Sequence, residues 1–371
     1  MAFRRHHGSK AEPRTIMLNY PGDTNRVFFD PNARDNCTEP FILLRDHCRK
    51  LGFSVEAAGR QSLQDCAWLL FWDAPSFASG AGFKGFLRRL RFGVNGGTRN
   101  WLNEVRNAGK MERLVLFLWE PPSVCPENWK IDFYSQFSTV FTWNDDLVDG
   151  IRVHKFCYPV PVHVLRVEPV VFSKKKLLVN ISMNKFSDYP NELYSARREA
   201  IRYFEKHRPD DFDLYGVGWE RPGLGKGSER RSLRSASISI PYRSYRGTVT
   251  HKWEVLPKYR FALCYENVSD QPGWITEKVF DCMRADCVPI YWGAPNVTDY
   301  VDPTAFIDRR KFSSNQELED YVCGIGERDY QRFRESIADY LVSQKFKAFL
   351  SPAFVENIVH VLGLDHAGLG L

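Results

Sequence analysis

Residues 258–299 constrain the fold more than any other stretch of this chain of 371 residues. They begin with a short apolar and aromatic run at 261–265, which is typical of a buried strand. A loop at 266–275 contains Pro and Gly, and from Thr276 onward the apolar residues recur at helical spacing. A second apolar run follows at 287–291. The order strand, loop, helix, strand predicts one unit of a parallel α/β sheet.

The loop 266–276 is the expected ligand-binding part of this unit. In parallel α/β sheets, ligands bind beyond the carboxyl ends of the strands. The start of a helix attracts phosphate through its free N–H groups and its dipole. Lys278 adds a positive charge there, and Glu277 can accept hydrogen bonds from a ribose or a sugar. Ordinary helix capping explains Thr276-Glu277 equally well, so this pattern alone leaves both interpretations open.

Four short motifs occur in order in this region: Tyr259-Arg260-Phe261, Tyr265-Glu266-Asn267, Ile275-Thr276-Glu277-Lys278 and Val288-Pro289-Ile290-Tyr291-Trp292-Gly293. Their sequence and spacing resemble the donor-binding motif of the α-1,3/4-fucosyltransferases, which bind GDP-fucose and transfer fucose with inversion. The resemblance implies two Rossmann-like α/β domains facing each other across a cleft, the arrangement called GT-B. Tyr265 stands where the family usually has Phe, and Trp274 stands where Tyr is common. Both departures keep an aromatic ring.

The resemblance also implies which residues hold the donor. Arg197 lies in the helical segment 191–207 and matches an arginine that contacts the donor diphosphate in the family. Its planar guanidinium can pair with two phosphate oxygens at once. Lys278 is expected to share this task. The remaining donor contacts that we expect are Lys252, Tyr265, Asn267, Trp274, Thr276 and Glu277.

Glu120 is the candidate catalytic residue. The apolar run 113–119 predicts a buried strand, and Glu120-Pro121-Pro122 follows it. In the resembled family a Glu-x-Pro turn after such a strand supplies the general base. A carboxylate that accepts the proton of a sugar hydroxyl during attack contributes about 10²–10⁴ in rate. Without the resemblance, an ordinary acidic residue in a surface loop is the alternative interpretation.

The chain length favours two domains. We expect a disordered lead-in at 1–14 and an N-terminal acceptor-binding α/β domain at 15–160. A C-terminal GDP-sugar-binding α/β domain is expected at 161–345, after a proline-rich linker. The C-terminal segment 346–371 is predicted to be helical and to pack back on the N-terminal domain, as the resemblance implies.

The run 137–143 is predicted as the last strand of the first half, and Asp145-Asp146 after it as a solvated turn. These paired acids are not flanked like a D-x-D metal motif, and the resemblance places no metal there. We therefore expect no required cofactor, and a divalent metal only as a stimulator. The expected partners are a nucleotide-sugar donor and an oligosaccharide or glycoconjugate acceptor, with no nucleic acid. The oligomeric state is left open.

Composition bears on location. The formal net charge of +6 suits an anionic ligand or a membrane surface. No window approaches the roughly 18 continuous apolar residues of a membrane span, and no apolar core follows the basic N-terminus. The nine cysteines form no C-x-x-C pair. These features predict a cytoplasmic protein of the bacterial type, with peripheral contact to the inner membrane face left open.

The sequence thus predicts an inverting glycosyltransferase. It would move fucose from GDP-fucose to N-acetylglucosamine or glucose in a lactosamine-like chain, in α-1,3/4 linkage. One alternative is an enzyme of the same fold with another nucleotide sugar. A second is a basic nucleic-acid-binding module, because the segment 221–246 holds seven Lys or Arg and one acid. That segment lacks the usual interleaved stacking aromatics, which favours the enzyme.

Overall fold

The computed structural model describes residues 13–20, 28–58, 62–74, 100–164, 168–220 and 241–365. Most of the predicted lead-in, most of the basic loop 221–246 and the last six residues lie outside these ranges.

The N-terminal half is built on a parallel sheet whose described strands run in the order β2-β1-β3-β4-β5-β6. The strands are β1 (Thr15–Asn19), β2 (Ser54–Ala57), β3 (Cys66–Trp72), β4 (Leu114–Leu118), β5 (Thr139–Thr142) and β6 (Val153–Lys155). The prediction that 137–143 forms the last strand was wrong, because β6 follows it and pairs with β5. A strand of three residues is too short to show an alternating pattern in the sequence.

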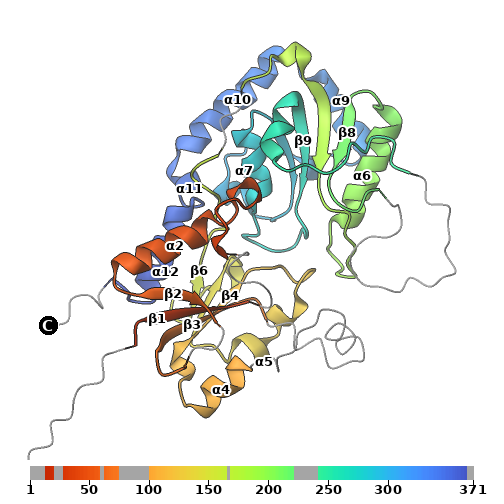
Figure 1. The fold of residues 1–371 in the computed structure, drawn as a ribbon. Helices are drawn as coiled ribbons and strands as arrows, with labels where there is room; N and C mark the ends of the chain where they lie inside the picture. The colour runs from red at the N-terminus through yellow and green to blue at the C-terminus, as the bar shows by residue number, and fades with distance from the viewer. Residues whose placement is uncertain are drawn as a thin grey trace, which may run out of the picture.

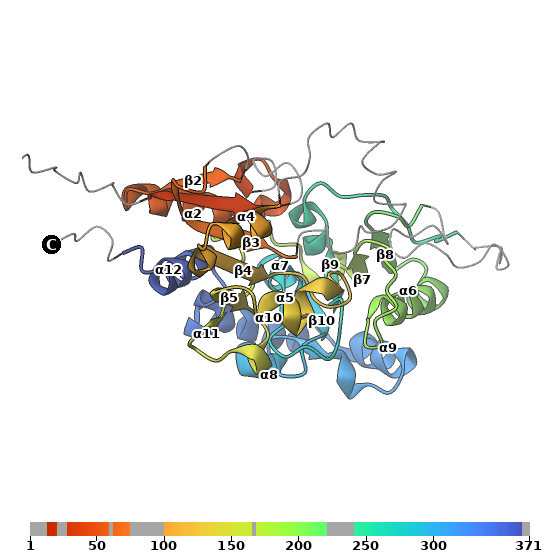
Figure 2. The same cartoon turned by 90° about the horizontal axis from the view of Figure 1, so that it is seen from below.

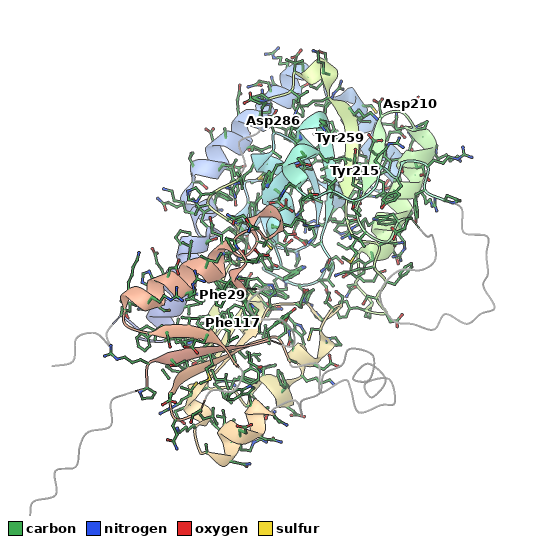
Figure 3. All side chains as sticks on the ribbon, in the orientation of Figure 1. Phe29, Phe117, Asp210, Tyr215, Tyr259 and Asp286 are labelled. Carbon is green, nitrogen blue, oxygen red and sulfur yellow. The ribbon has the colours of Figure 1, made fainter. Side chains whose placement is uncertain are left out.

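Successive residues of a strand point to opposite faces of the sheet, and both faces of this sheet are covered. On one face, Ile16 and Leu18 join a core with α2 (Glu39–Lys50). On the other, Met17 packs in a second core with α4 (Trp101–Asn107). Phe117 of β4 stacks between Trp72 and Phe141, with ring centroids 4.1 and 4.7 Å away, at the centre of the first core (Figure 3). The short helix α5 (Ile131–Tyr134) belongs to the second face.

The C-terminal half holds a second parallel sheet in the order β11-β10-β9-β7-β8 among the described strands. These are β7 (Lys176–Ile181), β8 (Phe212–Tyr215), β9 (Tyr259–Tyr265), β10 (Val288–Trp292) and β11 (Ile307–Asp308). Its helices are α6 (Tyr194–His207), α7 (Glu277–Arg284), α8 (Val297–Tyr300), α9 (Asn315–Gly324), α10 (Glu327–Val342) and α11 (Gln344–Lys347). α10 and α11 are separate helices, since Ser343 between them is extended and caps α11. Tyr215 of β8 and Tyr259 of β9 lie on either side of β7, and their hydroxyl groups are 3.4 Å apart (Figure 3).

Short 3-10 turns connect these elements at Arg34–Asn36, Met111–Arg113, Pro126–Trp129, Asp145–Leu147, Phe172–Lys174, Lys252–Glu254, Leu256–Lys258 and Arg309–Lys311.

The last helix, α12 (Ser351–Val361), returns to the N-terminal half and lies beside α2 (Figures 1 and 2). Phe354 of α12 meets Phe41 of α2 at 6.4 Å between ring centroids and packs in the same core. The chain enters α12 through paired backbone bonds, from Val160 N–H to Phe349 O and from Ser351 N–H to Val160 O. The linker and the C-terminal segment therefore hold each other as they cross between the halves. The exact domain boundaries stay predictions.

The carboxyl ends of the two sheets face each other. Ser187, after β7, donates a hydrogen bond of 3.0 Å to the carbonyl of Ser123, which follows β4. Asn144, after β5, donates one of 3.0 Å to Gln271, which follows β9. Residues from the ligand-binding edges of both halves thus meet, as two parallel sheets with a shared site require.

Asp145 lies at this contact, so the prediction of a solvated turn was wrong for this residue. Its carboxylate accepts hydrogen bonds from Lys155 at 2.5 Å, Tyr300 at 2.6 Å and Asn296 at 2.8 Å. The last two belong to the C-terminal half. Burial disfavours the charge of Asp145, but these three donors outweigh it and lower the pKa of the carboxyl group. Its neighbour Asp146 is exposed, as predicted.

Gly273 explains why the two halves approach so closely at this point. Its φ of +80° lies in the left-handed region, which L side chains rarely adopt. A Cβ atom at this position would collide with the carbonyl oxygen of Trp143 from the other half. The Pro272-Gly273 turn of the predicted donor loop is therefore also an interdomain contact.

Candidate active site

Glu120 lies two residues after the end of β4, at the carboxyl edge of the N-terminal sheet. Its carbonyl accepts a hydrogen bond of 3.2 Å from the indole of Trp129, and Pro121 after it is buried. Burial, followed by the nearby negative charge of Asp73, raises the pKa of the Glu120 carboxyl to about 7. Lys185, Lys278 and Glu277 of the opposite half also influence this pKa. The carboxyl group of Glu120 therefore lies within electrostatic range of the predicted donor motif, and its pKa suits proton transfer at neutral pH.

The sequence did not identify Asp73 and Asn128, which lie beside Glu120. Asp73 follows β3, the strand next to β4, and its carboxylate accepts the main-chain N–H groups of Trp119 and Glu120. Asn128 donates to the same carboxylate oxygen at 2.5 Å and accepts the N–H of Ala74 at 2.6 Å. An acid at the end of two adjacent strands was the available signal, but strand adjacency is not visible in the sequence.

A buried cluster centred on Glu266 organises the donor motif on the C-terminal edge. Glu266 is fully buried and accepts hydrogen bonds from the N–H and hydroxyl of Thr276, each at 2.9 Å. Its other carboxylate oxygen lies 2.8 Å from the ammonium of Lys278. Burial disfavours the charge of Lys278, but Glu266 and Glu277 outweigh it and raise its pKa. The cluster fixes the start of α7, where the sequence predicted phosphate binding.

A second cluster holds Lys252, Glu277 and Asp281. The ammonium of Lys252 lies 2.5 Å from Asp281 and 3.4 Å from Glu277. Burial disfavours the charge of Glu277, but Lys278 and Lys252 together lower its pKa. The N–H of Lys252 donates to Asp35 of the N-terminal half at 3.0 Å. Two predicted donor residues are thus joined to each other and to the opposite half.

Arg197, Lys252, Tyr265 and Lys278 line one pocket together with residues of β7 and α7. The structure therefore brings these four predicted donor residues together. Arg197 is only 4% exposed and donates to the main-chain carbonyls of Tyr265 and Glu266, which end β9. Its guanidinium thereby holds the end of the strand while contributing positive charge to the pocket.

Four predicted donor residues do not line this pocket: Thr276 and Glu277, which belong to the two clusters above, and Asn267 and Trp274. Asn267 follows the buried Glu266, and its carbonyl accepts the N–H of Leu193 at 2.9 Å, before α6. Trp274 is only 2% exposed, and its ring packs against Trp143 and Tyr158 of the N-terminal half at 4.5 and 5.8 Å. A donor contact by Trp274 stays a prediction, which this burial disfavours. The structure gives the ring a role in interdomain packing.

Lys185, in the loop after β7, is a further cation that the sequence analysis missed. Its positive charge lowers the pKa of Glu120, which places the ammonium near that carboxylate across the interface. A single lysine in a polar loop carries no sequence pattern that would have identified it.

Within the described part of the chain, no three His, Cys, Asp or Glu side chains gather in an arrangement that could hold a metal ion. The expectation that no metal is required stays a prediction. In the same residues, no helix is both long and apolar enough to cross a membrane.

The two facing α/β halves define the class of protein: the fold is the GT-B fold of glycosyltransferases. A solved structure of an alpha1,3-fucosyltransferase with GDP superposes with a TM-score of 0.51 at 15% identity, covering 98% of this chain and 94% of that one. An alpha-glucosyltransferase in complex with UDP and DNA gives a TM-score of 0.53 at 11% identity, covering 94% of this chain and 99% of that one. At these identities the likeness concerns the fold alone.

The sequence of the C-terminal half carries the similarity to a particular family. Residues 182–351 match the model described as glycosyltransferase family 10 (fucosyltransferase) C-term. This match covers less than half of the chain, and it is to the family that the motifs around 258–299 resemble.

Curated relatives match over shorter segments. An alpha-(1,3)-fucosyltransferase of Helicobacter pylori is 38% identical over 74 residues, or 20% of this chain. An alpha-(1,4)-fucosyltransferase of Arabidopsis thaliana is 45% identical over 69 residues, or 19% of this chain. A GDP-fucose protein O-fucosyltransferase 3 of Xenopus laevis is 35% identical over 85 residues, or 22% of this chain. The matched segments span only 15%, 17% and 18% of these relatives' own lengths.

Proposed function

We propose that this protein transfers fucose from GDP-fucose to a hydroxyl group of an acceptor glycan, with inversion, in α-1,3/4 linkage. The proposed acceptor sugar is N-acetylglucosamine or glucose in a lactosamine-like chain. The proposed setting is the cytoplasm of a bacterium, with no required metal. The family match of residues 182–351 supports the donor class, and the position of Glu120 opposite that motif supports the chemistry.

Glu120 is the proposed general base. A sugar hydroxyl is a weak nucleophile at neutral pH, and it attacks faster when a positioned carboxylate accepts its proton. A base works best when its pKa lies near the working pH. Burial and Asp73 bring the pKa of Glu120 to about 7, far above that of an exposed glutamate. Attack from the side of Glu120, opposite the leaving diphosphate, turns a β-linked donor into an α-linked product.

Lys278 and Arg197 are the proposed partners of the leaving diphosphate. As the bond from fucose to phosphate breaks, negative charge grows on the phosphate oxygens, and fixed cations lower the energy of that state. Lys278 is held in place by Glu266, and Arg197 by the carbonyls that end β9. Because both cations are oriented before the donor arrives, little reorganisation is needed during the reaction.

The observation that carries the proposal is that Glu120, after β4 of the N-terminal sheet, and Lys278, at the start of α7 in the C-terminal half, influence each other across the interface. A carboxylate that titrates near neutrality on one half faces the ion-paired Lys278 of the family motif on the other half. An inverting transfer needs a base and a leaving-group clamp on opposite sides of the reacting carbon. These residues occupy corresponding positions on the two carboxyl edges.

The test measures binding and transfer separately. Purified protein is titrated with GDP-fucose, GDP-mannose, UDP-glucose and UDP-galactose by calorimetry, with and without EDTA. Transfer to N-acetyllactosamine is then followed for the wild type, Glu120→Gln and Glu112→Gln. Glu112 precedes β4, and Glu120 follows it, so the control alters an acid at the opposite end of the same strand.

We expect selective binding of GDP-fucose that survives EDTA. Glu120→Gln should keep this binding and lose transfer by about 10²–10⁴, while Glu112→Gln should retain transfer. Tight binding of a different nucleotide sugar would keep the fold and reject the donor. Full activity in Glu120→Gln would reject the base, and transfer abolished by EDTA would reject metal independence.

A further inference from the structure

Asp73 occupies an unusual position beside the proposed base. It directly follows β3, its φ of 62° lies in the left-handed region, and its side chain turns toward the end of β4. One carboxylate oxygen, Oδ1, accepts the N–H groups of Trp119 at 2.8 Å and of Glu120 at 2.9 Å. Asp73 therefore binds the main chain of the residue that carries the base.

Asn128 completes this arrangement from a third segment of the chain. It is fully buried, and its amide donates to the same Oδ1 of Asp73 at 2.5 Å. Its carbonyl oxygen accepts the N–H of Ala74 at 2.6 Å. The three hydrogen bonds to Oδ1 restrain Asp73 in its left-handed conformation, which would otherwise be costly for a residue other than Gly. The turn after β3 and the turn after β4 are thereby joined.

Asp73 acts on Glu120 through its charge as well as through its hydrogen bonds. After burial, Asp73 is the largest influence that raises the pKa of Glu120. The opposing lysines, Lys185 and Lys278, lie on the other half. On its own half, Glu120 therefore has an acidic neighbour that is fixed by the fold and whose own pKa is also raised by burial.

We propose that Asp73 is a positioning residue for Glu120: the carboxylate of Asp73 binds the main chain of the turn that presents the base. The proposal rests on the proposed function only for the role of Glu120 as the base. The proposal separates two contributions of Asp73. Its Oδ1 atom, which accepts the hydrogen bonds, fixes the turn that carries Glu120. Its charge influences the pKa of Glu120.

The chain provides a matched control in Asp149. Its Oδ1 also accepts three hydrogen bonds, from the N–H groups of Ile151, Arg152 and Val153, each at 2.8 Å. It holds a turn before β6 in the same half, but it is exposed and does not act on Glu120. Asp149→Asn thus removes the charge from a similar turn without changing the surroundings of the base.

The first measurement does not depend on transfer activity. Protein with ¹³C-labelled glutamate carboxyl carbons is titrated by NMR, and the Glu120 signal is assigned by its loss in Glu120→Gln. We expect Asp73→Asn to lower the pKa of Glu120 by about one pH unit, because a like charge has been removed. Asp149→Asn should leave it unchanged. An Asp73→Asn titration that matches the wild type would overturn the electrostatic part of the proposal.

The second measurement follows transfer against pH. Asp73→Asn keeps the Oδ1 acceptor, so we expect most of the thermal stability to remain while the acidic limb of kcat/KM moves to lower pH. Asp73→Ala removes the acceptor too, and we expect a further fall in kcat with little change in donor Kd. If Asp73→Asn and Asp73→Ala have equal kcat, the positioning part is rejected.

The two experiments distinguish this proposal from the proposed function. If Glu120→Gln transfers fucose normally, Glu120 is not the base, and the proposed function fails at that point whatever Asp73 does. If Glu120→Gln is inactive but the Asp73 variants behave like Asp149→Asn in both assays, the base stands and Asp73 only holds a turn. Loss of folding in Asp73→Ala would leave Asp73→Asn and the NMR titration as the decisive measurements.

Discussion

The two edges of the interface are built in opposite ways. On the C-terminal edge, each proposed cation has a carboxylate or carbonyl partner: Lys278 has Glu266, Lys252 has Asp281, and Arg197 has two main-chain carbonyls. On the N-terminal edge, Glu120 lies beside another acid, Asp73. The C-terminal edge holds its cations through attraction to carboxylates and carbonyls. On the N-terminal edge, burial and the neighbouring acid raise the pKa of Glu120.

This difference fits the chemistry of each edge. A site for a diphosphate needs cations held in a fixed position, and pairing with buried carboxylates provides that order at some cost in net positive charge. A general base must take up a proton near neutral pH, so a fully satisfied ion pair would make it too weak. The proposed donor edge, at the end of β9 and the start of α7, is therefore organised for position, and the proposed acceptor edge, at the ends of β3 and β4, for basicity.

The largest expected effect breaks the donor edge. Lys278→Met leaves the carboxylate of Glu266 fully buried without its cation. Removing one partner of a buried pair costs about 3–5 kcal/mol of unfolding free energy. Urea unfolding measures this loss, and calorimetry with GDP-fucose should show weakened binding. The double variant Glu266→Gln/Lys278→Met should recover part of the stability, because no buried charge is left unpaired.

Lys258→Met is the control for this experiment. Lys258 is exposed in the same half, just before β9. Its substitution should change stability by less than about 0.5 kcal/mol. Equal losses in Lys258→Met and Lys278→Met would show that ion pairing does not organise the donor edge.

The next effect concerns the basicity of Glu120. The base must be deprotonated to act, and its pKa is raised to about 7. Activity should therefore fall as the pH drops through 7, by about tenfold for each further pH unit in kcat/KM. Donor affinity measured over the same range separates this effect from weakened binding. An acidic limb near the ordinary pKa of glutamate, about 4.3, would contradict a buried base beside Asp73.

The same shift makes a prediction about stability. A carboxyl group whose pKa is higher in the folded protein binds more protons when folded, so its contribution to stability falls as the pH rises from the unfolded pKa to about 7. Glu120→Gln cannot ionise and escapes this loss. Relative to the wild type, it should be more stable at pH 8 than at pH 5 in urea unfolding. A difference that is independent of pH would indicate that Glu120 titrates alike in both states.

A smaller effect is expected where the two edges are joined. Asp145→Asn removes the charge that Lys155, Tyr300 and Asn296 bind, and hydrogen bonds to charged groups contribute about 1.5–3 kcal/mol. We expect a loss toward the lower end in urea unfolding, since the amide oxygen still accepts. Asp146→Asn changes the exposed neighbour and should be neutral. Equal losses of stability in Asp145→Asn and Asp146→Asn would indicate that Asp145 behaves as part of a solvated turn, as the sequence predicted.

The sequence predicted the donor edge better than the acceptor edge, and the reason is physical. Strand β9, the loop after it, α7 and β10 are adjacent in the chain, so Glu266, Thr276 and Lys278 meet within one short segment. Local periodicity and one continuous motif sufficed to place them. Even here, the central role of Glu266 was missed, because a buried acid in a motif does not reveal its partners.

The acceptor edge is assembled from residues distant in sequence. Asp73, Glu120 and Asn128 come from three segments, and they meet only because β3 pairs with β4. The sequence identified Glu120 through its turn but gave no sign of strand order. Asp145 was misjudged for the same reason, since two of its three partners lie in the other half.

The smallest expected effect tests Trp274, where the sequence prediction and the geometry differ. The sequence predicted a donor contact, whereas the structure packs the ring against Trp143 and Tyr158 with 2% exposure. Among the described residues, the buried indole N–H of Trp274 has no hydrogen-bond partner. Trp274→Phe removes that unsatisfied group and also leaves space in the packing, and these two effects oppose each other.

We therefore expect Trp274→Phe to change the unfolding free energy by less than about 1.5 kcal/mol and to leave the Kd for GDP-fucose unchanged. Urea unfolding and calorimetry on the same preparations measure both quantities. Tyr265→Phe, which removes a buried hydroxyl beside Arg309 and keeps the aromatic ring, is a matched comparison within the predicted donor pocket. If Trp274→Phe weakens the donor by about tenfold, or roughly 1.4 kcal/mol, while stability is kept, the ring contacts the donor. The contact of Trp274 with Trp143 and Tyr158 would then be part of the proposed donor site. The residues that bind the donor would in that case not be confined to the C-terminal half.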